Sequence, residues 1–112
     1  MTSVESCLYP ILMVLPARSA DIEVDSGQGG CYLLHFDRPY RHAAHYTGWS
    51  IDIVERIRRH REGNGARLVE VVTQAGIDFV VARVWIGADR VKERRLKRSG
   101  GASRYCPVCK SR

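Results

Sequence analysis

Three glycine-containing breaks divide this 112-residue chain into segments that each hold only a few short elements. They are Gly27-Gln-Gly-Gly30, Gly63-Asn-Gly65 and Ser99-Gly-Gly101. Glycine adopts backbone conformations that other residues avoid and commonly follows the last turn of a helix, so such clusters mark turns. A chain of this length has room for one modest hydrophobic core. The sequence predicts one small domain at 30–98, with an N-terminal extension at 1–29 and a tail at 99–112.

The segments between these breaks predict the element order β-β-α-α-β-α. Cys31–Phe36 and the segment around Ala44–Trp49 have strand character, and a short polar loop at 37–42 favours antiparallel pairing. Ser50 is the expected cap of the helix that follows, with Asp52 in its first turn. Further on, we expect helices at 50–62 and 66–75, a strand at 77–86 and a helix at 88–98. The pattern predicts an α/β fold, a small sandwich with a central three-stranded antiparallel sheet flanked by helices.

Acidic and basic residues are distributed unevenly along the chain. Residues 1–37 contain one basic and five acidic residues, whereas residues 38–112 contain seventeen basic and seven acidic ones. From residue 90 onward, nine basic residues accompany a single acid, Glu93. Such a surface favours a polyanionic partner, because binding releases the counterions of the phosphates. DNA is the expected partner and RNA is not excluded, although a basic surface that only aids solubility would give the same counts.

The chain has no apolar run of the length that a membrane helix needs. The nearest segment, Cys7–Ala17, contains Pro10 and Pro16 and is too short to span a bilayer. Membrane binding is also disfavoured because the basic tail has no large apolar helix face beside it. Four unevenly placed cysteines are too few for a disulfide framework. A cytoplasmic, reducing location is therefore expected.

Two of the four cysteines stand close together in the tail, as Cys106-Pro-Val-Cys109. They supply two of the four ligands that a structural Zn²⁺ ion usually takes. Cys7, Cys31, a histidine or a second chain would have to complete the set. Free thiols in a tail turn, with the tail forming a loop to its end, are the alternative interpretation.

Helical periodicity places two charged side chains at the margins of the core. In the first expected helix, Arg56 falls beside the buried stripe. In the last, Glu93 lies just past the apolar arc. On periodicity alone, charge balancing against Arg90 or Lys97 is the favoured interpretation of Glu93, ahead of metal binding.

A wider pattern resembles the GIY-YIG nuclease family. Gly30-Cys31-Tyr32 in the first strand and Tyr46-Thr47-Gly48 in the second are similar to its two defining tripeptides. Arg56 follows Tyr46 by ten residues, His60 follows four residues later, and Glu93 stands near the start of the last helix. The resemblance covers the whole predicted domain. Either tripeptide alone is a weak signal, but these positions together, in order and on the expected elements, are a strong one.

The resemblance implies hydrolysis of a phosphodiester with one divalent cation, Mg²⁺ or Mn²⁺. By position, Tyr32 would be the general base or would orient the attacking water, with Tyr46 beside it. Arg56 would hold the phosphate, Glu93 the metal, and His60 would support the site. Arg56 and the cation are expected to lower the pKa of Tyr32 from its usual value of about 10.

The chain also departs from the family pattern. Cys31 and Thr47 occupy middle positions where the family favours an apolar residue. The stretch between the two tyrosines is long, which predicts an enlarged hairpin loop. A further family position, often asparagine, has no counterpart, since Asn64 lies in the turn between helices. Taken singly, each candidate side chain is explained equally well by packing, hydrogen bonding or charge balance, and only their joint arrangement favours catalysis.

The leading hypothesis is a stand-alone, divalent-metal-dependent endonuclease that hydrolyses DNA. A non-catalytic nucleic-acid-binding module with the same fold, or a nuclease acting on RNA or branched DNA, are the alternatives. No separate recognition domain is predicted, so low sequence specificity is expected unless a homodimer or another partner supplies it. The basic side chains expected to contact nucleic acid are Arg38, Arg41, Arg59, Arg90, Arg94 and Lys97.

Overall fold

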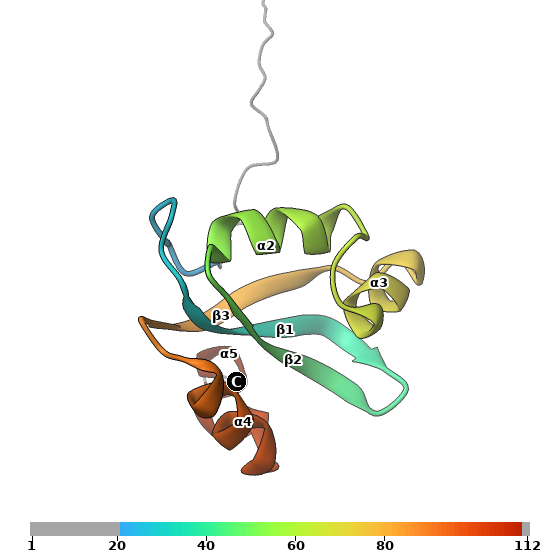
Figure 1. The fold of residues 1–112 in the computed structure, drawn as a ribbon. Helices are drawn as coiled ribbons and strands as arrows, with labels where there is room; N and C mark the ends of the chain where they lie inside the picture. The colour runs from blue at the N-terminus through green and yellow to red at the C-terminus, as the bar shows by residue number, and fades with distance from the viewer. Residues whose placement is uncertain (1–20, 111–112) are drawn as a thin grey trace, which may run out of the picture.

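The computed structural model describes residues 21–110 and places three strands in one antiparallel sheet (Figure 1). β1 spans Gly30–Tyr40, β2 spans Ala43–Ser50 and β3 spans Phe79–Ile86. The order across the sheet is β2-β1-β3, so β1 is the central strand and is paired along both edges. This arrangement confirms the expected α/β class and its three-stranded antiparallel sheet.

Helices flank the sheet on both sides. α2 spans Ile53–Arg61 and α3 spans Arg67–Gln74, and both follow the hairpin of β1 and β2. α4 spans Arg90–Arg98, and the tail adds a 3₁₀ turn, η1, at Ala102–Tyr105 and a short helix, α5, at Pro107–Lys110. In Figure 1, α2 lies above the sheet while α4 and α5 lie below it. Within the described part of the chain, no helix has the length and apolarity to cross a membrane.

The first seven residues of β1 are all buried, so both faces of this strand are covered. One face carries Tyr32, Leu34 and Phe36, which belong to the main core with residues of α2 and α3. The opposite face carries Leu33, which packs in a second, smaller cluster with Cys106 of the tail. Each large apolar side chain buried in this way contributes about 1.5–3 kcal/mol. The central strand is therefore stabilised by packing from above and from below.

The N-terminal caps of α2 and α4 are both aspartates. The Asp52 side chain accepts a hydrogen bond from the Glu55 backbone N–H at 3.2 Å, and that of Asp89 accepts one from the Lys92 N–H at 3.0 Å. The expectation that Ser50 caps the first helix is wrong. Its hydroxyl instead bonds to the backbone of Asp52, two residues on, and fixes the turn that leads into the cap. Aspartate satisfies an otherwise unpaired helical N–H and also complements the dipole.

The expected polar loop at 37–42 is also wrong, because β1 continues to Tyr40 and only a two-residue turn joins the strands. The pairing passes from His35 opposite His45 to Tyr40 opposite Ala43, with a register shift between them. The additional residues are accommodated in a bulge, which keeps the hairpin paired where a simple loop would open it.

The tail is ordered instead of forming the loop that the sequence suggested. η1 and α5 lie against the sheet, and the Cys106 side chain there is completely buried. Of the expected N-terminal extension, residues 1–20 lie outside the described residues. Residues 21–22 run beside β3, where the Ile22 N–H donates to the Val81 carbonyl at 2.9 Å. This contact covers part of the otherwise free edge of β3.

Asp21 fastens this segment to the domain. Its carboxylate accepts hydrogen bonds from the Val81 N–H at 2.7 Å and from the Arg61 guanidinium at 2.8 Å. The Asp21 side chain is only 6% exposed and that of Arg61 15%. A carboxylate so enclosed is stabilised only while these donors remain in place.

We expect Asp21→Asn to lower the free energy of unfolding by about 1.5–3 kcal/mol, the usual contribution of a hydrogen bond to a charged group. Urea denaturation would measure the change. Asp25→Asn, at an exposed position four residues later, is the control and should leave the midpoint unchanged. Equal midpoints for the two variants would contradict the anchoring role of Asp21.

Candidate active site and metal centre

Two buried aromatic side chains form the centre of the first candidate site. The Tyr32 hydroxyl, from β1, is hydrogen-bonded to Nε2 of His60, from α2, at 2.7 Å. Both side chains have no exposed surface. Tyr46, from β2, packs against this pair, with its ring centroid 6.3 Å from that of Tyr32 and 5.6 Å from that of His60. Three of the five sequence-predicted site residues thus form one aromatic cluster.

Gly48 makes this cluster possible. A Cβ atom at that position would lie 2.5 Å from the Tyr32 hydroxyl oxygen and 2.8 Å from an edge carbon of the Tyr46 ring. Gly48 also stands directly opposite Tyr32 in the hairpin register. At this position the rings of two tyrosines approach the strand backbone closely. No other residue fits without displacing a ring.

Arg56 and Glu93 both act electrostatically on the Tyr32 hydroxyl. Burial and the neighbouring Tyr46 raise the pKa of Tyr32 well above its usual value. The Arg56 guanidinium opposes this shift through a hydrogen bond and its charge, and the Glu93 carboxylate adds to it. Removal from water outweighs the effect of Arg56, so these residues shift the pKa of Tyr32 in the direction opposite to the one that the sequence suggested. Tyr32 is a neutral phenol here.

Glu93 lies in the first turn of α4 with two cationic partners. Its carboxylate is 3.2 Å from the Lys97 ammonium and 3.9 Å from the Arg90 guanidinium, and its side chain is 12% exposed. Lys97 also lies over the Tyr46 ring, 5.6 Å from its centroid. Glu93 is therefore a charge balancer in this conformation, as periodicity alone favoured. Since Lys97 is half exposed, its ion pair is weak enough to be exchanged for another cation.

His60 is sealed away from water and kept neutral. Burial lowers its pKa to about 4, and the positive charge of Arg56 acts in the same direction. Its Nδ1 atom is buried with no hydrogen-bond partner within the described part of the chain. Gly65 lies against that atom so closely that a Cβ there would come within 2.0 Å of it. The turn between α2 and α3 thus closes the back of the site.

Access to the cluster comes from the edge of β2. Arg56 and Tyr46 are partly exposed, although Tyr32 is not. A cavity of about 220 Å³ lies beside Tyr46 and Lys97, with residues 100–102 of the tail forming its other wall. A ligand in this cavity would meet Tyr46 and Lys97 before it reached the Tyr32 hydroxyl.

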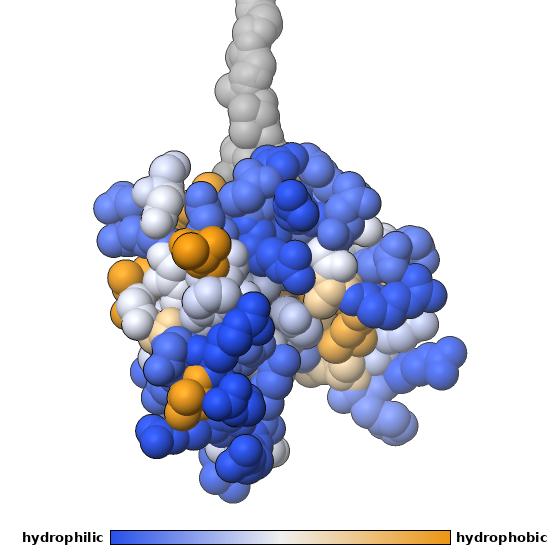
Figure 2. Space-filling model, in the orientation of Figure 1, coloured by the Kyte–Doolittle hydropathy of each residue, from blue (hydrophilic) through white to orange (hydrophobic). Residues whose placement is uncertain are grey.

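The basic residues expected at a nucleic-acid interface are all exposed but do not form one patch. Hydrophilic side chains cover α2 and α4 on the face seen in Figure 2. Arg59 lies on α2 with its guanidinium 3.5 Å from Glu55, and Arg90 of α4 stacks over the Trp49 ring at 4.4 Å. Arg94 and Lys97 lie further along α4. Arg38 and Arg41 lie at the far end of the hairpin, where Arg38 donates to the Ala75 carbonyl.

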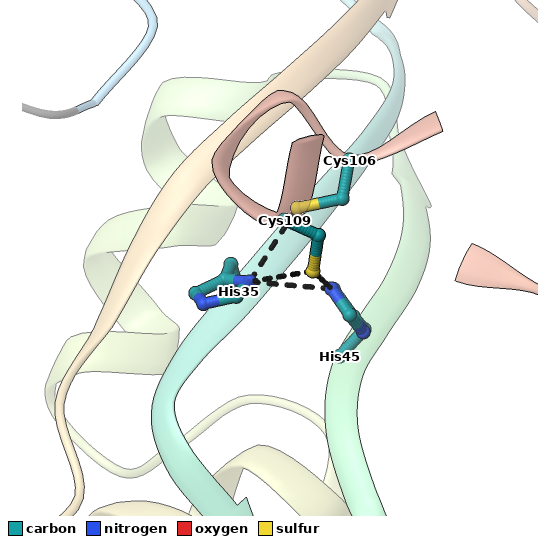
Figure 3. A group of neighbouring side chains, drawn as sticks. All are labelled: His35, His45, Cys106 and Cys109. Atoms are coloured by element: carbon teal, nitrogen blue, oxygen red, sulfur yellow. Dashed lines mark hydrogen bonds between the residues drawn. The ribbon is translucent and has the colours of Figure 1, made fainter. Parts of the chain in front are cut away.

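A second cluster lies on the opposite face of β1 (Figure 3). His35 of β1, His45 of β2 and the tail residues Cys106 and Cys109 place one nitrogen or sulfur atom each within 4.8 Å of all the others. Nδ1 of His35 is 3.2 Å from Nε2 of His45 and 3.4 Å from the Cys106 sulfur. The Cys109 sulfur is 3.7 Å from His35 and 3.4 Å from His45. These four side chains can hold a metal ion.

Four of the six distances between these atoms, 3.2, 3.4, 3.7 and 3.4 Å, are close to those of a tetrahedral site. With Zn–N of about 2.0 Å and Zn–S of about 2.3 Å, two nitrogens lie about 3.3 Å apart and nitrogen and sulfur about 3.5 Å apart. Burial and the neighbouring His35 lower the pKa of His45, so its imidazole is held in the neutral form that metal coordination needs.

Two histidines complete the cysteine pair, and the other residues considered from the sequence do not. The Cys31 thiol donates instead to the Asp89 carbonyl at 3.7 Å, and burial raises its pKa. Cys7 lies outside the described residues. The sequence signal for His35 was the unbroken apolar run around it, because a strand covered on both faces must give an inward histidine a partner. His45 could be found only from the strand register, which places it opposite His35.

Comparison with family models, curated proteins and solved structures found no match.

The buried neutral His60 predicts a pH-dependent stability. Because its pKa is about 4 in the folded chain and about 6.5 when unfolded, the unfolded state binds more protons between these values. The free energy of unfolding should therefore be highest above pH 6.5. It should fall by up to about 3 kcal/mol as the pH drops toward 4. Urea denaturation between pH 7.5 and 4.5 would measure this slope.

His60→Gln should reduce the slope, while His42→Ala, at an exposed position in the hairpin turn, should leave it unchanged. If His60→Gln and the wild-type chain lost stability in parallel over this range, the buried neutral histidine would not be its source.

Proposed function

We propose that this chain is a divalent-metal-dependent endonuclease that hydrolyses DNA phosphodiester bonds. One arrangement carries the proposal: the Tyr32 hydroxyl is hydrogen-bonded to His60 and enclosed by Tyr46, and Arg56 precedes His60 by one turn of α2. Glu93 of α4 adjoins this cluster through Lys97, whose ammonium lies 3.2 Å from the Glu93 carboxylate and over the Tyr46 ring. A structural tyrosine needs one hydrogen-bond partner and no converging charges. The resemblance of these positions to the GIY-YIG nuclease pattern supports the same conclusion.

In this proposal Arg56 holds the scissile phosphate. Phosphodiester cleavage concentrates negative charge on the phosphate oxygens, and a guanidinium offers planar, permanently charged donors to them. Arg56 is partly exposed and also interacts with the buried Tyr32. A side chain anchored at its inner side and open at its outer side loses little freedom when a phosphate binds, which favours the transition state.

Glu93 would hold the cation, Mg²⁺ or Mn²⁺. A single carboxylate fits the way in which proteins hold Mg²⁺ beside phosphates, with water and the substrate as further ligands. The cation would stabilise the charge that develops on the phosphate. Glu93 would exchange its pairing with Lys97 for this cation, and the half-exposed ammonium would move into solvent. Metal affinity is then weak until DNA contributes its own oxygens.

The burial of Tyr32 favours a positioning role over that of a general base. A phenol with a raised pKa does not accept a proton readily, and its oxygen has no exposed surface. In this conformation it aligns Arg56 and His60, and it would contact the attacking water only after the partly exposed Tyr46 moves aside. Exposed basic residues on α2 and α4 support a polyanionic substrate, and a homodimer or partner would supply sequence specificity.

We expect the wild-type protein to nick supercoiled plasmid with Mg²⁺ or Mn²⁺. Arg56→Ala and Glu93→Ala should each lower the rate by about 10²–10³-fold, the usual effect of removing one charge-stabilising group. DNA binding should persist in Glu93→Ala. Arg67→Ala and Glu70→Ala are matched controls, because these residues form an exposed ion pair on α3 and should leave the rate unchanged.

The alternatives are outcomes of the same assay extended to other substrates. If the wild-type protein binds DNA but cuts neither plasmid, RNA nor branched DNA, it is a nucleic-acid-binding module and the nuclease proposal fails. Cutting of RNA or of branched DNA alone, still lost in Arg56→Ala, would keep the site and change its substrate.

We further propose that the ion held by His35, His45, Cys106 and Cys109 is Zn²⁺. Two sulfurs and two imidazole nitrogens are the ligands that zinc prefers, whereas Mg²⁺ takes oxygen. Thiolate ligands also require a reducing compartment, which agrees with the cytoplasmic location proposed from the sequence.

Elemental analysis of purified protein should find one zinc per chain, and Cys109→Ser should lose it. Cys31→Ser, at the thiol outside the cluster, should retain it.

A further inference from the structure

Apart from a small apolar cluster with the sheet, the tail between residues 99 and 110 has few interactions of its own to hold it in place. η1 and α5 have four residues each, far below the length at which an isolated helix is stable in water. The Tyr105 hydroxyl donates to the Leu96 carbonyl at 2.5 Å, and the Arg83 guanidinium donates to the Tyr105 carbonyl at 3.3 Å. The Tyr105 ring also meets Trp85 edge-on, at 5.8 Å between centroids. These contacts join the middle of the tail to α4 and β3, while Cys106, Val108 and Cys109 at its end pack in the small apolar cluster around Leu33 and Ala82.

The metal cluster would add a metal-mediated connection to the apolar packing at the end of the tail. Two of its side chains, His35 and His45, stand on adjacent strands of the rigid sheet, opposite one another in the register. The other two, Cys106 and Cys109, stand on the tail. An ion bound by all four would join the tail to β1 and β2 at once. Zinc binding there would displace one proton from each thiol into solvent and would close all four positions of a tetrahedral ion.

The same segment forms one wall of the cavity beside the candidate active site. Gly100, Gly101 and Ala102 face Tyr46 and Lys97 across this cavity of about 220 Å³. His45, a member of the metal cluster, lines it as well and directly precedes Tyr46 on β2. The position of the tail therefore determines whether the cavity exists, and an ion in the metal cluster would hold the tail in that position.

We propose that His35, His45, Cys106 and Cys109 form a closed structural zinc site that fastens the tail to the sheet and thereby builds the cavity beside Tyr46. The ion has no open coordination position and takes no part in hydrolysis. This inference rests on the proposed identity of the ion as zinc, and it does not depend on the nuclease activity.

The test uses the full-length protein, stripped of metal with a chelator under reducing conditions and then reloaded with Zn²⁺. Trypsin cleavage after Arg104 in the tail should be at least about tenfold faster in the stripped form, because proteolysis follows the population of the open state. Reloading should restore protection. Equal cleavage rates with and without zinc would overturn the fastening role, even if one zinc binds per chain.

Replacement of zinc by Co²⁺ tests the ligand set. A tetrahedral site with two thiolates should give an intense sulfur-to-cobalt absorption, reduced in Cys106→Ser and in His45→Ala. His42→Ala is the matched control, since His42 is exposed in the hairpin turn and should leave the spectrum unchanged. A six-coordinate spectrum in the wild-type protein, or full zinc content in His45→Ala, would overturn the site.

Plasmid nicking by the same samples separates this inference from the proposed function. If zinc-loaded protein is protected at Arg104 but does not cut, the nuclease proposal fails and the zinc site stands. If stripped protein is unprotected at Arg104 yet cuts at the zinc-loaded rate, zinc fastens the tail but the cavity is not needed for cutting. That result would overturn a role of the cavity in the proposed hydrolysis.

Discussion

Both candidate sites depend on the two-residue period of the central strand. Along β1, Tyr32 points to the side of α2 and α3, while Leu33 and His35 point to the side of the tail. Pairing along both edges fixes this orientation, with Tyr32 opposite Gly48 on one side and Val84 on the other. A slip of one residue would exchange the two faces. It would remove the tyrosine from His60 and the histidine from the cysteines in a single step.

Packing and reactivity oppose one another at the tyrosine cluster. Complete burial of the Tyr32 hydroxyl costs free energy unless a partner replaces water, and His60 is that partner. The same burial disfavours any charge on either group, so the phenol stays protonated and the imidazole stays neutral. Gly48 and Gly65 permit the arrangement, because a Cβ atom at either position would clash with one of the rings. A cluster of this kind serves better as a rigid support for the Arg56 side chain than as a group that donates or accepts protons.

The sequence was sufficient for the class of fold and insufficient where neighbouring elements decide the local structure. Glycine breaks and apolar periodicity gave the order of strands and helices, because they act within one segment. The hairpin was misread since a bulge, and not a loop, accommodates its additional residues. The cap of α2 was assigned to Ser50 instead of Asp52, because both residues are good caps and only the backbone of the preceding turn distinguishes them.

The two candidate sites also combine features that are visible within one segment with features that depend on neighbouring elements. The resemblance to the family pattern identified Tyr32, Arg56 and Glu93 as candidates, but it carried no information on how deeply Tyr32 is buried. The cysteine pair was visible in the sequence, whereas its histidine partners depended on a strand register and on the return of the tail to the sheet. Contacts between residues more than sixty positions apart follow from the packing of whole elements, which no local pattern encodes.

Ligand chemistry would keep the two proposed metal ions apart within so small a domain. Glu93 offers a hard, partly exposed oxygen beside Lys97, which suits a cation that must also bind phosphate and exchange. The cluster of cysteines and histidines offers soft, buried atoms and no carboxylate. His45 and Tyr46 are consecutive residues of β2, yet each belongs to a different one of these environments. An ion that remains bound on one face of the sheet can therefore support the edge at which the other ion comes and goes with the substrate.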